Sequence, residues 1–109
     1  MGLTRTDNYS IDQNQLSKMM KVISHPARIA ILQYIIDANQ CIGNDLLDVL
    51  GLAQPTISLH LKELKLAGLI KGTIRGTSLS YCINKEKWDE YRDTFSAFFV
   101  SIDEREQNC

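Results

Sequence analysis

Apolar residues recur every three or four positions along the first part of the chain, a spacing that predicts helices. The pattern places helices over residues 12–23, 27–38, 44–50 and 54–67. The second of these segments is apolar on most of its circumference, so it should be buried nearly all round. The hydroxyl of Ser24, just before a proline, is expected to cap this second helix.

Glycines follow the third and fourth predicted helices, at Gly51 and Gly68. Glycine readily adopts the left-handed conformation in which many helices end. A short helix, a tight turn and a longer helix therefore occupy residues 44–67, and this arrangement is typical of a helix-turn-helix. In the longer helix, Ile57, Leu61 and Leu64 lie on one side and should face the core.

Apolar and polar residues alternate over residues 69–83, which predicts two strands joined by a turn at residues 75–77. Leu79, Tyr81 and Ile83 should share the inward face of this hairpin, or wing. A last helix is predicted over residues 86–102.

The whole pattern predicts one domain over residues 1–109, mainly α with a small β-hairpin: a winged helix-turn-helix with about five helices. Residues 1–10 are polar and expected to be flexible. The first and last helices carry apolar stripes that a symmetric second copy could bury, with packing inside one protomer as the alternative. The predicted dimer interface consists of Leu16, Met19, Met20, Trp88, Tyr91, Phe95, Phe98 and Phe99.

Charge is unevenly distributed along a chain whose net charge is −1. Residues 54–85 carry +4 and the remainder −5. A local basic surface can attract phosphate whatever the total charge, although a solvated face would have the same composition. The chain has no apolar run long enough to span a bilayer and no secretory signal at its start, so we expect a cytoplasmic protein without a membrane partner.

The fourth predicted helix is narrow enough for a DNA major groove, and the side opposite its core stripe is polar or exposed. His60 lies at the boundary of the buried side, where a structural role or a backbone contact is the stronger expectation. Arg75 at the tip of the wing and Lys71 beside it are expected to reach phosphate or the minor groove, with plain solvent exposure as the alternative. The predicted DNA contacts are Gln54, Pro55, Thr56, Ser58, Leu59, His60, Lys62, Lys71 and Arg75.

Three segments together resemble the ArsR/SmtB family of repressors. They are Ser-His-Pro-Ala-Arg-Ile-Ala-Ile-Leu at residues 24–32, Leu-Gly-Leu-Ala-Gln-Pro-Thr-Ile-Ser at residues 50–58, and Ala-Gly-Leu-Ile at residues 67–70. The resemblance covers residues 16–100. It implies a dimeric repressor that binds double-stranded operator DNA and leaves it when an inducer binds. Leu59 departs from the family pattern, which often has arginine or another polar residue there.

The family's usual metal ligands are missing from this chain. Residues 42–46 lack the paired cysteines found there in metal-sensing relatives, and the last helix offers Asp89 but no histidine. No metal site or other cofactor is therefore predicted with these ligands, although cysteines could hold a soft metal or metalloid by another route.

Three cysteines, an odd number at wide spacing, argue against a disulfide framework, and reduced thiols are the expected state. Cys41 and Cys109 are the candidate thiol sensor, because relatives use two cysteines distant in sequence. Cys82 is the weaker candidate, and all three could be spectators.

Other classes of protein are less well supported. Asp45 and Asp48 have no histidine or glycine-rich phosphate loop near them, so no catalytic site is predicted and the chain is not expected to be an enzyme. A winged helix that binds a protein instead of DNA is the alternative function.

Overall fold

The computed structural model describes residues 8–75 and 78–107. It has four α-helices, one 3₁₀ helix and a small antiparallel sheet, so the predicted winged helix-turn-helix is confirmed. In chain order the elements are α1 (Ile11–Ile23), α2 (Pro26–Ala38), β1 (Ile42–Gly43), η2 (Asn44–Leu50), α3 (Gln54–Leu66), β2 (Ile70–Arg75), β3 (Ser78–Ile83) and α4 (Lys85–Val100).

The sheet has three strands in the order β1-β3-β2, not the two strands of a simple hairpin. The additional strand, β1, pairs only through Ile42 with Tyr81 and Gly43 with Ser80. Two residues are too few to produce a recognisable alternation, which explains why the sequence pattern did not indicate this strand. The third predicted helix is the 3₁₀ helix η2.

The helices end close to the predicted positions, but the residue that caps α2 differs from the prediction. Ser10 begins α1 with a reciprocal capping box to Gln13, so the end of the predicted flexible segment is ordered; residues 1–7 lie outside the described part. The prediction that Ser24 caps α2 is wrong. His25 accepts a hydrogen bond from the backbone N–H of Ala27 (3.0 Å), while the Ser24 hydroxyl donates to the carbonyl of Lys21 at the end of α1.

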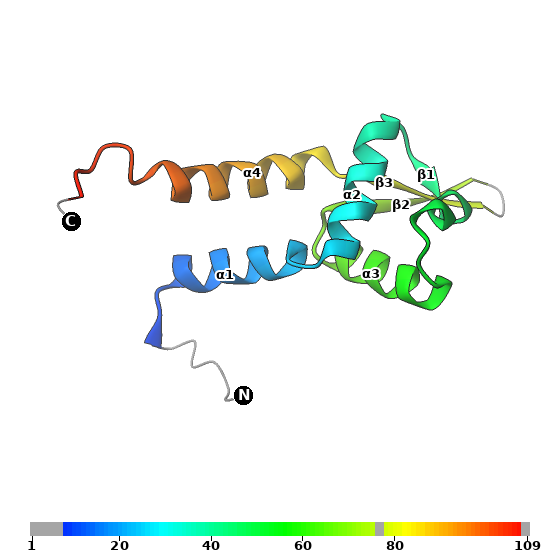
Figure 1. Cartoon of the computed structure of the whole chain (residues 1–109), viewed down its shortest axis with the longest axis horizontal. Helices are drawn as coiled ribbons and strands as arrows, with labels where there is room; N and C mark the ends of the chain where they lie inside the picture. Colours follow the sequence, from blue (N-terminus) through cyan, green and yellow to red (C-terminus); the bar gives the residue numbers. More distant parts are fainter. Residues whose placement is uncertain (1–7, 76–77, 108–109) are drawn as a thin grey trace.

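A core of aliphatic residues joins η2, α2, α3 and the sheet into a compact head, shown in Figure 1. Of the three strand residues predicted to face inward, Tyr81 and Ile83 pack against this core. The prediction is wrong for Leu79, which is 37% exposed near the end of the hairpin. The largest fully buried side chains are Ile31, Ile42, Leu47, Ile57, Leu61, Leu64, Leu69 and Ile70.

Helix α2 is not buried all round, contrary to the prediction. Ile29 and Ile36 are 54% and 41% exposed, so within residues 8–75 and 78–107 their side of the helix is not fully covered. The partly buried Trp88 of α4 lines a shallow hollow with both of them.

Helices α1 and α4 run antiparallel as two arms that extend from the head (Figure 1). They give the chain an elongated shape, 57 × 33 × 24 Å. Over the described residues, no helix combines the length and apolar character that a membrane span requires.

Candidate nucleic-acid interface

The outer side of α3 forms the candidate DNA-reading surface. Its inner side is anchored by Ile57, Leu61 and Leu64, which are fully or almost fully buried. At 3.6 residues per turn, Pro55, Leu59 and Lys62 lie opposite them, and Thr56 and Ser58 lie at the two edges. All five of these residues are exposed. The helix therefore offers hydroxyl groups, an ammonium group and the apolar side chain of Leu59 to a partner.

His60 does not belong to this exposed surface, although it was among the predicted DNA contacts. Its side chain is buried, with 6% exposure. Arg28 of α2 donates from Nε to Nδ1 of His60 (3.1 Å) and from Nη1 to the carbonyl of Val22 (3.0 Å). One arginine thus connects α1, α2 and α3, and its partner His60 helps to fix the position of α3.

Burial is the main reason why the pKa of His60 lies below its ordinary value of 6.5. The electrostatic interactions with His25 and Arg28 lower this pKa further. The His25 ring lies 4.5 Å from the His60 ring, centroid to centroid. The neutral imidazole is also the form that can accept the hydrogen bond from Arg28.

Gln54 connects the two helices of the helix-turn-helix. Its amide donates to the Asp48 carboxylate, so η2 and the start of α3 are tied by a side-chain hydrogen bond across the turn. Gly51 forms that turn with φ of +72°. Both side chains of the pair are exposed, and Gln54 would have to exchange its partner to contact a base.

One predicted contact on the wing, Lys71, lies on the outward face of the sheet. Lys71 is exposed on β2 and pairs across the ladder with Cys82 of β3. Arg75 ends β2 opposite Ser78, and the predicted tip at residues 76–77 lies outside the described residues. Helix α3 packs on β2, so the wing lies beside the DNA-reading helix.

The cysteines differ from the expected reduced thiols. Cys41 and Cys82 form a disulfide, with their Cα atoms 4.3 Å apart. The sequence pattern failed here because the pairing depends on β1, which brings residue 41 to the edge of β3. The other proposed sensor residue, Cys109, lies outside the described residues. No cluster of three or more histidine, cysteine or acidic side chains suited to a metal occurs in residues 8–75 or 78–107.

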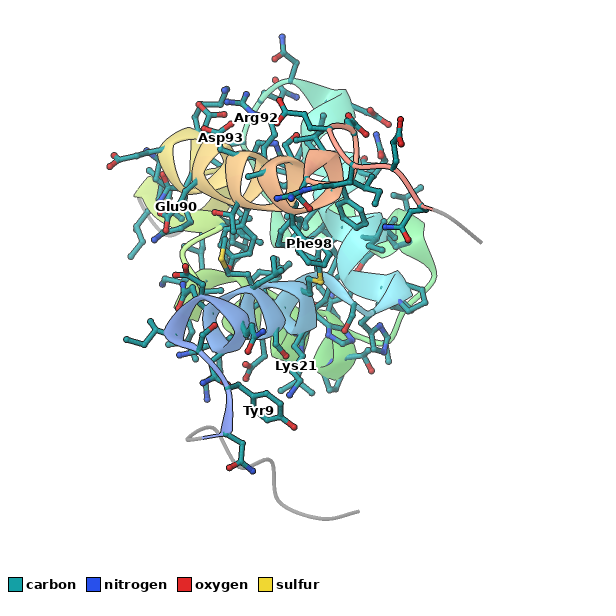
Figure 2. The ribbon with its side chains drawn as sticks, turned by 90° about the vertical axis from the view of Figure 1, so that its left-hand side faces the viewer. Tyr9, Lys21, Glu90, Arg92, Asp93 and Phe98 are labelled. Carbon is teal, nitrogen blue, oxygen red and sulfur yellow. A yellow bond between two sulfur atoms is a disulfide. The ribbon has the colours of Figure 1, made fainter. Side chains whose placement is uncertain are left out.

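The predicted dimer residues separate into a buried, a half-buried and an exposed group. Met19 and Tyr91 are core residues of the protomer, 3% and 8% exposed, because they lie where α1 and α4 pack against the core of the head. Leu16, Met20, Trp88 and Phe95 are half-buried. Phe98 and Phe99 near the outer end of α4 are 52% and 64% exposed. Viewed along the arms, Phe98 lies on the side of α4 that faces α1, whereas Arg92 and Asp93 point away (Figure 2).

A helix-turn-helix with an exposed second helix and an adjoining wing defines a winged helix-turn-helix protein. Residues 25–71 match the model of "Bacterial regulatory protein, arsR family". The arsenical resistance operon repressor of Staphylococcus xylosus is 35% identical over 69% of this chain and 71% of its own length. The chain therefore belongs to the arsR family, whose members are transcriptional regulators and not enzymes.

Two further comparisons give the extent of the similarity. The HTH-type transcriptional repressor SmtB of Mycobacterium tuberculosis is 34% identical over 59% of this chain, and the match spans 47% of that repressor. The solution structure of the homodimeric winged helix-turn-helix DNA-binding domain Mb0332 from Mycobacterium bovis superposes with a TM-score of 0.63. That alignment is 17% identical, covers 99% of this chain and 98% of the other, and supports the fold.

Proposed function

We propose that this chain is a transcriptional repressor that binds double-stranded operator DNA sequence-specifically as a homodimer. The observation that carries the proposal is the exposed outer side of α3 beside the wing, in a chain of a regulator family. In this fold the second helix of the helix-turn-helix enters the major groove.

The outer side of α3 supplies the proposed base contacts. Thr56 and Ser58 can hydrogen-bond to base edges or phosphates, and Leu59 can meet the methyl group of thymine. Lys62, and Lys71 with Arg75 on the wing, would contact phosphates or the minor groove. Gln54 and Pro55 lie at the first turn of α3, next to the same surface.

The arms supply the proposed dimer interface. The outer end of α4 and the turn after it carry exposed apolar side chains, whose contact with water is unfavourable. They are Phe98, Phe99, Val100 and Ile102. A homodimer that buries it would present two copies of α3 to two half-sites of DNA. The homodimeric relative from Mycobacterium bovis supports this arrangement.

An inducer is proposed to release the repressor from its operator, and a thiol-reactive species or a soft metal or metalloid is the class that the chain's chemistry suggests. Within the described residues, Cys41 and Cys82 are the groups best suited to such chemistry.

The proposed function is tested by fluorescence anisotropy on DNA from upstream of the gene, at increasing salt. We expect specific affinity that falls steeply with salt, because each phosphate contact releases counterions. Lys62→Ala should reduce the slope of log affinity against log salt by about 1. Lys21→Ala, an exposed lysine of α1 (Figure 2), is the matched control and should leave the slope unchanged.

Two results would contradict the proposal. Equal slopes for Lys62→Ala and Lys21→Ala would remove α3 from the DNA interface. Absence of specific, salt-dependent binding would instead favour a winged helix that binds a protein partner.

A further inference from the structure

The Cys41–Cys82 disulfide lies at the surface of the sheet. The β1–β3 register pairs Ile42 with Tyr81, so the next pair outward is Cys41 with Cys82, directly opposite one another. Cys41 is exposed and Cys82 half-buried. Small reagents in solution can therefore reach this bond, unlike a disulfide enclosed in a core.

The same row of the sheet contains a proposed DNA contact. Lys71 pairs with Cys82 on the other side of β3, and residues paired across strands point to the same face. Lys71, Cys82 and Cys41 thus form one row across the outward face. The hydroxyl of Thr73, another outward residue of β2, lies 4.0 Å from the Cys82 sulfur.

The disulfide closes a ring that contains every element of the DNA-reading unit. Between Cys41 and Cys82 the chain forms β1, η2, α3, β2 and most of β3. Apart from this bond, β1 is attached to β3 through only two residue pairs. The bond therefore adds a covalent connection between the start of the helix-turn-helix and the wing, beside the buried core that they share.

A hollow of about 490 Å³ adjoins the two sulfurs. Ile35, Ile36 and Trp88 give it apolar walls, and Lys85, paired with Asp89, lies at its edge. Its volume is in the range of small-molecule sites, so an organic thiol of low molecular mass can approach the bond from this side.

We propose that Cys41 and Cys82 are a reversible redox site at which low-molecular-mass thiols control DNA binding: the disulfide form binds the operator tightly and the dithiol form weakly. This inference rests on the proposed function and specifies its regulation. The disulfide form should bind more tightly because it is preorganised: the closed ring holds α3 and the wing in one relative position before DNA binds. When the disulfide is reduced, the relative position of α3 and the wing must be fixed as DNA binds, which weakens the affinity.

The chemistry is thiol–disulfide exchange. A thiolate RS⁻ attacks one sulfur of the pair, forming a mixed disulfide and releasing the other cysteine as a thiolate, which is then protonated. A second RS⁻ attacks the sulfur of the first R group. The products are RSSR and two cysteine thiols, so two electrons pass from two RSH molecules to the protein. Excess RSSR reverses both steps.

The full chain is tested after equilibration with oxidised or reduced glutathione. Iodoacetamide labelling and mass spectrometry count free thiols, and anisotropy measures affinity for the operator DNA. In the oxidised form we expect Cys41 and Cys82 to carry neither label nor glutathione, because they are joined to each other, whereas Cys109 is labelled or glutathionylated. In the reduced form all three cysteines should be labelled, and affinity should be at least tenfold higher in the oxidised form. Cys82→Ser should bind weakly in both buffers, and Cys109→Ser, the matched control, should respond like the wild type.

Three results would overturn the inference: three labelled cysteines in excess oxidised glutathione, equal or weaker DNA affinity of the oxidised form, or loss of helical circular dichroism on reduction in step with the loss of affinity. These differ from failure of the proposed function, in which the labelling changes as expected but no redox form binds DNA specifically.

Discussion

At the residue scale, His60 shows how a side chain of the DNA-reading helix can serve the fold instead of the DNA surface. The helical spacing predicted that His60 lies at the boundary of the buried side, and in the structure its side chain is buried next to that side. Its partners were not predictable, because Arg28 is 32 residues away and meets it only after α2 and α3 pack.

The pH dependence of stability should report on His60. Its folded pKa lies below 6.5, so as the pH falls below that value the unfolded chain gains a proton that the folded chain does not. The free energy of unfolding should therefore decrease from pH 8 to pH 5.5, measured by urea denaturation at fixed protein concentration. His60→Gln should flatten this dependence. An equally steep curve for His60→Gln would assign the effect to other groups.

Leu59 is predicted to contribute to specificity rather than to phosphate binding. Leu59→Ala should weaken specific DNA affinity about fivefold by removing an apolar contact, while the salt slope stays unchanged. Leu66→Ala, an exposed leucine at the far end of the same helix, is the control and should have little effect. Equal losses for specific and unrelated DNA would contradict a base contact.

At the element scale, the turn between η2 and α3 depends on the conformation of one residue. Gly51 has φ of +72°, and an added Cβ would meet no atom within 4 Å. The cost of substitution is therefore backbone strain alone. Gly51→Ala should lower the free energy of unfolding by about 1 kcal/mol, measured by urea denaturation. Gly51→Asn should cost less, because asparagine tolerates this region better. Equal stability of all three proteins would contradict this explanation.

Sequence patterns predicted the elements that have a strong period. Each α-helix was found within a few residues of its observed ends, and so were both wing strands. The patterns could not predict β1, which is two residues long, and therefore missed the cysteine pair that β1 brings together. The cap of α2 was also missed, because histidine rarely occupies that position.

At the scale of the whole molecule, the arms determine how the head can be used. The periodicity of α1 and α4 identified apolar stripes but could not say which turns pack inside the protomer. Met19 and Tyr91 near the head are buried, and the aromatic residues further out are not. Only the three-dimensional arrangement separates these two groups.

Phe99→Asp should shift the protein from dimer to monomer in light scattering after size exclusion, because a charge would enter the proposed interface. DNA affinity should fall at least about tenfold with the loss of the second half-site contact. Ala97→Asp, two residues earlier on the other side of α4, is the control and should stay dimeric. A dimer that survives Phe99→Asp with unchanged circular dichroism would place the interface elsewhere.

The disulfide ring also changes what a single break in the chain can do. If trypsin cuts after Lys71, between the two cysteines, both pieces remain covalently attached through the sulfurs. The nicked protein should run as one band on a denaturing gel without reductant and as two bands with reductant. Two bands in both lanes would mean that the cysteines are not joined. The segment proposed to contact DNA would thus tolerate a cut that separates an open chain into two molecules.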